Sequence, residues 1–127
     1  MKKLIYSLFL GAATAAMASQ FPPAFALNTV NATLLSANTN QASALLNVES
    51  VKNHTFVVIN STLRTNTVTI YGTLDTTNLI SLYSTNMTVI STNSFALTEQ
   101  RWTYIGASVS GLTGTNCNVT VEYLGGN

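Results

Sequence analysis

In Thr67-Val68-Thr69-Ile70-Tyr71 polar and apolar side chains alternate, and this pattern indicates the fold class. In an extended chain Val68 and Ile70 share one face, and the two threonines and the tyrosine share the other. β-branched residues at this period are typical of an antiparallel strand with one buried face and one face in water. The same alternation occurs in residues 103–109 and 118–123, so the sequence predicts an all-β protein.

Further candidate strands have the same character, at residues 30–35, 43–51, 56–60, 79–83, 87–91 and 95–97. Turn-forming residues separate the strands, at 37–40, 52–53, 75–78, 92–93 and 111–116. About seven to nine short strands at this spacing predict an antiparallel β-sandwich, of jelly-roll or immunoglobulin-like topology, rather than a barrel. Residues 42–48 would also tolerate a helical turn.

The composition narrows the class of protein. Of 127 residues, 46% are hydrophobic and only nine are charged, while 20 threonines, 12 serines and 14 asparagines supply the polar surface. Disordered chains have lower hydrophobicity and higher net charge, and helical bundles use Ala, Glu and Lys on their surfaces. The net charge is +1, and it is −1 without Lys2 and Lys3. A nucleic-acid partner is therefore excluded, because phosphate binding needs a basic face.

The N-terminus predicts an export signal. Lys2 and Lys3 precede an apolar stretch at residues 4–18. A membrane-spanning helix needs about 20 apolar residues, whereas the apolar region of a signal peptide has about 7–15. The segment is therefore a signal helix rather than a span, and an uncleaved anchor is the alternative.

Two small-x-small patterns, at residues 16–18 and 24–26, mark candidate cleavage sites. Cleavage after Ala26 is favoured because the residues that follow are polar and strand-forming, and cleavage after Ala18 is the alternative. The chain then consists of a signal peptide, residues 1–26, and one β-sandwich domain, residues 27–127, with no stable membrane span after cleavage.

The candidate reactive groups are few. His54 is the one imidazole, and the carboxylates Glu49, Asp75, Glu99 and Glu122 are scattered along the chain. Catalysis or metal binding needs a cluster of partners around such a group. Asp75 stands alone where a calcium loop would carry several acids, so it predicts an Asx-type turn. No catalytic residue, metal site or cofactor is expected.

Two kinds of modification are compatible with export. Cys117 is a single thiol, which either lies buried as a small hydrophobe, the favoured interpretation, or bridges two subunits. Five N-glycosylation sequons occur, at Asn31, Asn53, Asn60, Asn86 and Asn118. About four are expected by chance in this composition, so they reflect composition rather than selection for glycans.

Aromatic residues offer one binding hypothesis. Trp102, Tyr104 and Tyr71 are candidates for a platform on which sugar rings stack. The favoured interpretation is that Trp102 anchors the core or the edge of a sheet, because a single tryptophan among strand residues usually packs.

Gly106 interrupts the longest apolar-rich alternation, residues 102–109. We expect this segment to be a central strand that pairs with residues 119–123 across the loop at 111–116. A glycine inside a strand marks a bulge or a close approach by another group. Tyr71 or Tyr123 is expected to cover it, as aromatic rings cover strand glycines elsewhere.

Several of these segments resemble a known module. The run Val68-Thr69-Ile70-Tyr71-Gly72-Thr73-Leu74-Asp75-Thr76-Thr77-Asn78-Leu79 resembles the strand and Gly-Ser-x-Asp-Gly-x-Asn-Trp hairpin of small β-sandwich modules in phage virion proteins. Residues 101–109, the Gly-Thr loop at 111–115 and Val119-Thr120-Val121 resemble the closing strands of the same modules.

The resemblance covers about residues 57–125, with Leu79 where the module has Trp and Gly106 where it has Arg. It implies a non-enzymatic part that decorates heads, tails or fibres. Together with the export signal, it predicts a structural or surface-display protein that associates with itself or with other surface or virion proteins. A small secreted carbohydrate-binding module is the alternative.

Overall fold

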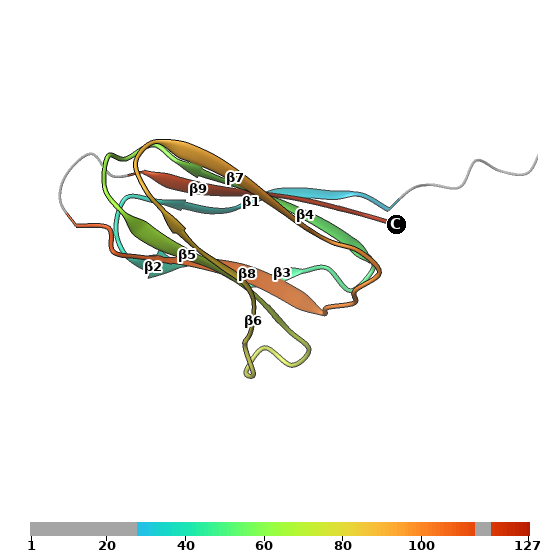
Figure 1. Cartoon of the computed structure of the whole chain (residues 1–127). Helices are drawn as coiled ribbons and strands as arrows, with labels where there is room; N and C mark the ends of the chain where they lie inside the picture. Colours follow the sequence, from blue (N-terminus) through green and yellow to red (C-terminus); the bar gives the residue numbers. More distant parts are fainter. Residues whose placement is uncertain (1–27, 114–117) are drawn as a thin grey trace, which may run out of the picture.

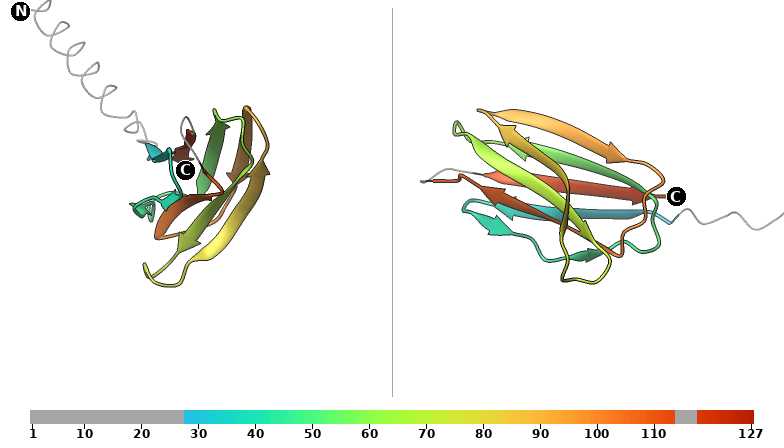
Figure 2. Two further views of the ribbon diagram at one scale, coloured as in Figure 1. Left: turned by 90° about the vertical axis from the view of Figure 1, so that its left-hand side faces the viewer. Right: turned by 60° about the horizontal axis from the view of Figure 1, so that its bottom comes forward.

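The computed structural model describes residues 28–113 and 118–127, in which nine strands form two antiparallel sheets. The two sheets lie face to face as the layers of a sandwich (Figures 1 and 2). The predicted antiparallel β-sandwich is therefore confirmed. The predicted signal peptide, residues 1–26, lies outside the described residues. No helix in the described part has the length and hydropathy that a membrane crossing requires.

The first sheet has the order β1-β9-β4-β7, with β1 at Val30–Ala37, β9 at Val119–Gly126, β4 at Asn53–Asn60 and β7 at Ser91–Leu97. The second sheet has the order β2-β8-β5-β6, with β2 at Gln41–Ala42, β8 at Tyr104–Ser110, β5 at Asn66–Thr73 and β6 at Ile80–Met87. The short strand β3 (Leu46–Asn47) also pairs with β8.

The core lies between the sheets and follows the predicted alternation. The inward side chains of β8 and β9 are at most 3% exposed: Ile105, Ala107, Val109, Val119, Val121 and Tyr123. In β5, Val68 and Ile70 are fully buried, as the alternation in residues 67–71 predicts.

A row of aromatic rings crosses this core. Tyr83 stacks on Phe95 with ring centroids 4.4 Å apart, and Phe95 lies 6.1 Å from Phe56. Phe56 in turn lies 5.3 Å from Tyr123, which stacks at 5.9 Å on His54. The row joins β6, β7, β4 and β9, so it ties both sheets together through contacts that are distant in sequence.

The predicted pairing of residues 102–109 with residues 119–123 is wrong. β8 pairs with β5 along its length, whereas β9 lies between β1 and β4 in the other sheet. The connection from β8 to β9 is longer than the two to five residues typical of hairpin loops, and it crosses from one sheet to the other. The inward faces of the two strands therefore meet across the core rather than within one sheet.

The boundaries of β6 and β7 also differ from the prediction. The sequence predicts separate strands at residues 79–83 and 87–91, followed by a turn at 92–93. In the structure β6 continues to Met87, and β7 begins at Ser91 after a turn at residues 88–90. Val89 has φ 53° in this turn. A β-branched residue rarely adopts that conformation, so the local sequence carries no turn signal there.

The expected strand at residues 43–51 is largely absent. Only the two-residue strands β2 and β3 pair with β8 in this region, on either side of a bend. Ser43 fixes the bend, since its backbone N–H donates to the Ala107 carbonyl at 2.8 Å and its Oγ accepts from the Ala107 N–H at 3.0 Å. The edge of the second sheet is therefore short and irregular, and such an edge disfavours pairing with the sheet edge of another molecule.

Two strand glycines of the second sheet are covered by aromatic rings. Tyr71 pairs with Gly106, and a Cβ built on Gly106 would lie 2.5 Å from Tyr71 Cε2. The Tyr71 hydroxyl donates to the Ala107 carbonyl at 3.3 Å. Trp102, which precedes β8, covers Gly72 in the same way, with its Cδ2 2.6 Å from the built Cβ. The expectation that Tyr71 or Tyr123 covers Gly106 is confirmed, and the ring is that of Tyr71.

Candidate interaction surface

The surface feature that stands out is aliphatic. Among the described residues, eight large aliphatic side chains are between 36% and 77% exposed: Ile59, Leu63, Leu74, Leu79, Ile80, Val89, Ile90 and Leu124. Six of them belong to two groups of connecting residues, one at each end of the β5–β6 hairpin. The strand pattern of the sequence did not reveal these groups, because Leu79 and Ile90 were assigned to strands.

The first group is the hairpin tip, residues 74–80, which consists of the connection from β5 to β6 and the first residue of β6. In Figure 1 this connection extends below the rest of the sandwich. Leu74, Leu79 and Ile80 are 66%, 53% and 52% exposed. The tip therefore presents three aliphatic side chains on a projecting turn.

Asp75 organises the hairpin tip. Its Oδ1 accepts hydrogen bonds from the backbone N–H of Asn78 at 2.8 Å and of Thr77 at 3.0 Å, and from the Thr73 hydroxyl at 3.0 Å. Its Oδ2 accepts from the Asn78 side-chain amide. This confirms the predicted Asx-type turn. The backbone N–H donors of Asn78 and Thr77 hold the pKa of the Asp75 carboxyl well below its usual value of 3.8.

The low pKa of Asp75 predicts a pH dependence of stability. A carboxyl whose pKa is depressed by folding contributes stability above its unfolded pKa of 3.8 and loses it as the pH falls toward the folded pKa. We expect the wild-type protein to lose more unfolding free energy on acidification below about pH 4 than Asp75→Asn does. Urea titrations of both proteins at neutral and acidic pH measure the difference. If both proteins lost the same unfolding free energy between neutral and acidic pH, the prediction that the Asp75 carboxylate stabilises the fold would be wrong.

The second group is the loop end: Leu63 and Arg64 of the β4–β5 loop, with Val89 and Ile90 of the β6–β7 turn. Leu63, Val89 and Ile90 are 77%, 55% and 67% exposed. Both connections lie at the left-hand end of the sandwich in Figure 1. Buried Asn60 holds the two together, because its Nδ2 donates to the Val89 carbonyl at 2.7 Å and its Oδ1 accepts from the Thr62 N–H at 3.2 Å.

The outer faces of the two sheets are polar by comparison. On the second sheet Thr67 donates to Asn86 Oδ1 at 2.7 Å, and the hydroxyls of Thr69 and Ser84 lie 3.1 Å apart. On the first sheet the Thr33 hydroxyl lies 3.0 Å and 2.9 Å from the two carboxylate oxygens of Glu122. These cross-strand pairs satisfy polar groups within the sheet.

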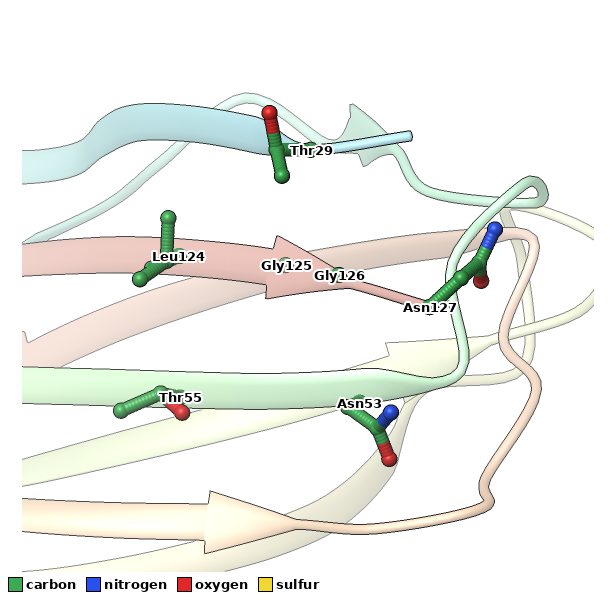
Figure 3. Close-up of a pocket in the computed structure, with 7 residues that line it drawn as sticks. All are labelled: Thr29, Asn53, Thr55, Leu124, Gly125, Gly126 and Asn127. Atoms are coloured by element: carbon green, nitrogen blue, oxygen red, sulfur yellow. The ribbon is translucent and has the colours of Figure 1, made fainter. Parts of the chain in front are cut away.

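A surface groove of about 250 Å³ lies on the first sheet, at the end of the sheet where β1 and β4 begin and β9 ends (Figure 3). It is lined by Thr29, Asn53, Thr55, Leu124, Gly125, Gly126 and Asn127. None of these side chains is titratable, so the groove offers only neutral polar groups and one aliphatic side chain.

His54 is a core residue rather than a reactive one. It is 1% exposed, its Nδ1 lies 2.9 Å from the Tyr123 hydroxyl, and its Nε2 lies 3.0 Å from the Gln100 carbonyl. A carbonyl only accepts, so Nε2 carries a proton and donates to the Gln100 carbonyl, while Nδ1 pairs with the Tyr123 hydroxyl. Both ring nitrogens are therefore occupied by internal hydrogen bonds. Burial raises the pKa of the Tyr123 phenol to about 12.

Tyr123→Phe is expected to destabilise the protein by about 1–3 kcal/mol, because it leaves the buried His54 Nδ1 without its hydrogen-bond partner. The matched control is Tyr83→Phe, which keeps its ring stacked on Phe95 and is expected to change stability by no more than about 0.5 kcal/mol. Denaturant melts of both variants measure the difference. Equal denaturant midpoints for the two variants would contradict the prediction that the hydrogen bond between Tyr123 and His54 stabilises the protein.

The acids do not gather around His54. No group of three or more His, Cys, Asp or Glu side chains within residues 28–113 and 118–127 could hold a metal ion. Glu122 lies with Thr33, and Asp75 lies within the hairpin tip. Glu49 and Glu99 are exposed, and their backbone N–H groups donate to Asn47 and Asn53 side chains.

The three predicted stacking residues have different environments. Tyr71 is only 8% exposed, because its ring lies over Gly106. Trp102 is half-buried and packs against the core, with its Nε1 3.4 Å from Gln100 Oε1. Tyr104 is half-buried at the start of β8. A stacking platform would therefore rest on Trp102 and Tyr104 alone.

The predicted modification sites also differ in exposure. Asn31, Asn86 and Asn118 are exposed and Asn53 is half-buried. Asn60 is fully buried, and its amide is engaged at the loop end, so the folded chain keeps that sequon out of reach. Cys117 lies outside the described residues.

Comparison with known proteins assigns the fold. The sequence matches no protein-family model and no curated protein. The crystal structure of the SPBc2 prophage-derived protein YomS matches with a TM-score of 0.65 and 13% identity, over 84% of this chain and all of YomS (100%). The match confirms the resemblance to phage-related β-sandwich modules at the level of the fold.

Two further structures match less closely. One is from work describing Bacillus endospore appendages as disulfide-linked pili, with a TM-score of 0.42 and 13% identity over 79% of this chain and 81% of the other. The second is infectious bursal disease virus, Gx strain, with a TM-score of 0.35 and 11% identity over 79% of this chain and 40% of the other. Of these three structures, YomS is the one whose match is close enough to assign the fold.

Proposed function

We infer that this chain is an exported, non-enzymatic β-sandwich that works by associating with copies of itself or with other proteins of a particle or cell surface. The observation that carries the inference is the exposure of eight large aliphatic side chains on the described part of a chain with nine charged residues. Extended apolar patches on soluble proteins mark sites of interaction. Low charge also removes long-range repulsion between copies.

The use of the titratable groups supports a non-enzymatic role. His54 is buried with both nitrogens in hydrogen bonds, and the Asp75 carboxylate holds the hairpin tip. Glu122 accepts from Thr33 on the outer face of the first sheet. A catalytic site needs such groups to converge on a reacting atom, whereas here each one stabilises its own part of the sandwich.

Two features support the proposed location of the protein on a particle or cell surface. The predicted signal peptide, residues 1–26, supports export, with cleavage after Ala26 or, alternatively, after Ala18. The fold shared with a prophage-derived protein supports a phage-related origin. A surface-layer subunit and a virion decoration both present such a module to their surroundings, and in both the module works by association.

Size-exclusion chromatography with light scattering tests the proposal. The exported product is expected to show a mass that rises above that of the monomer with concentration, or to bind intact particles or cell envelopes. Mass spectrometry of the same product establishes export, the cleavage site and any glycosylation. A strictly monomeric product without affinity for particles or envelopes would contradict the proposal.

A further inference from the structure

We propose that copies of this chain associate head to tail, with the hairpin tip of one copy packed against the loop end of the next. The inference rests on the proposed function and specifies its partner, a second copy, and its interface. The chemistry of the interface is a pair of aliphatic patches, each carrying one charge of opposite sign.

The two patches lie at opposite ends of one strand. β5 runs from Asn66 to Thr73, so the loop end precedes it and the hairpin tip follows it. Eight extended residues place the two ends about 25 Å apart. Contact between two different patches is heterologous, and such a contact leaves a free tip and a free loop end on every pair. Association therefore continues into a ring or a filament.

The patches match in chemistry. The hairpin tip presents Leu74, Leu79 and Ile80 with the carboxylate of Asp75, and the loop end presents Leu63, Val89 and Ile90 with the guanidinium of Arg64. Among the described residues of the connections at the loop end, Arg64 is the charged one. Its Nη1 donates to the Thr113 hydroxyl at 3.2 Å, which ties the guanidinium to the connection that follows β8.

The charges also disfavour the symmetric alternatives. Tip against tip would bring two Asp75 carboxylates together, and loop end against loop end would bring two Arg64 guanidinium groups together. Tip against loop end pairs opposite charges instead. Specificity for one arrangement commonly arises in this way, from repulsion in the competing arrangements as well as attraction in the preferred one.

Both patches are held in place before they meet a partner. The Asp75 hydrogen bonds fix the tip, and Asn60 fixes the loop end through the Val89 carbonyl. Val89 has φ 53°, a conformation that Asn or Gly adopts at lower energy than Val does. Strained residues that persist in a fold commonly serve a function, and the exposed Val89 side chain fits a role in binding. Preorganised patches bind more tightly because less conformational freedom is lost.

The test compares variants of the exported product by concentration-dependent sedimentation. Leu79→Ser at the tip and Val89→Asn at the loop end are each expected to weaken association about ten- to hundredfold, since each removes a large aliphatic side chain from the interface. Val89→Asn is also expected to raise the melting temperature of the monomer, because Asn tolerates the left-handed conformation. Weaker association in a more stable protein cannot result from unfolding.

A mixing experiment tests the head-to-tail arrangement directly. Leu79→Ser retains an intact loop end and Val89→Asn retains an intact tip, so the mixture is expected to form dimers and no larger species. Leu124→Ser is the matched control, since Leu124 is 53% exposed on the outer face of the first sheet, outside both patches. It is expected to associate as the wild type does.

The outcomes separate this inference from the proposed function. Wild-type association that persists in both patch variants, or that Leu124→Ser abolishes, overturns the head-to-tail interface and leaves the proposed function standing. Mixed variants that do not form dimers also overturn it. A wild-type product that is monomeric and binds neither particles nor envelopes overturns both.

Discussion

Replacing Phe56 by alanine is expected to lower the free energy of unfolding by about 3–5 kcal/mol. Phe56 is fully buried in β4 and lies at the centre of the aromatic row, between Phe95 at 6.1 Å and Tyr123 at 5.3 Å. Its removal leaves a cavity between the two sheets that the surrounding strands can close only in part. Urea or thermal unfolding measures the loss.

Thr55→Val is the control for this prediction. Thr55 neighbours Phe56 in the same strand, but it is exposed on the outer face of the first sheet. Valine keeps the β-branched shape, so the expected change in stability is within about 0.5 kcal/mol. A cost of less than about 1 kcal/mol for Phe56→Ala would contradict the central position of Phe56 in the core.

Gly106→Val is expected to destabilise the protein by about 1–3 kcal/mol through overpacking. A Cβ on Gly106 would lie 2.5 Å from Tyr71 Cε2 and 2.9 Å from the Tyr71 hydroxyl oxygen, so the ring must move. That movement also breaks the hydrogen bond from the hydroxyl to the Ala107 carbonyl. Gly126→Val is the matched control, since a Cβ at Gly126 meets nothing within 4 Å. An unchanged denaturant midpoint for Gly106→Val would contradict the close packing of the Tyr71 ring on Gly106.

A double-mutant cycle assigns the effect of Gly106→Val to Tyr71. In a Tyr71→Ala background the ring is absent, so Gly106→Val is expected to cost less than it does in the wild type. Residues in direct contact typically show a coupling of about 0.5–3 kcal/mol. Additive effects of the two substitutions would mean that the strain arises elsewhere in the second sheet.

Local patterns determined the fold class and the buried faces of β5, β8 and β9. Val68 and Ile70 are buried in β5, and the inward rows of β8 and β9 match the alternation of the sequence, because the side-chain period of a strand is a local property. The Asp75 turn is also local, since its donors come from residues within three positions. Gly106 has no side chain and therefore leaves space on one face of β8. The sequence alone could thus predict that a large ring, which proved to be that of Tyr71, covers this glycine.

Strand pairing and surface function depended on the tertiary structure. β8 and β9 are neighbours in sequence but belong to different sheets, because the connection between them is too long for a tight hairpin, and β9 pairs with β1 and β4 instead. The turn at Val89 depends on Asn60, and the placement of the buried His54 ring depends on Tyr123, each through a hydrogen bond between residues far apart in the chain. The hairpin tip could be located from its turn residues, but the loop end could not. It forms only when β4 and β7 pair and bring the two connections carrying Leu63 and Val89 to the same end of the sandwich.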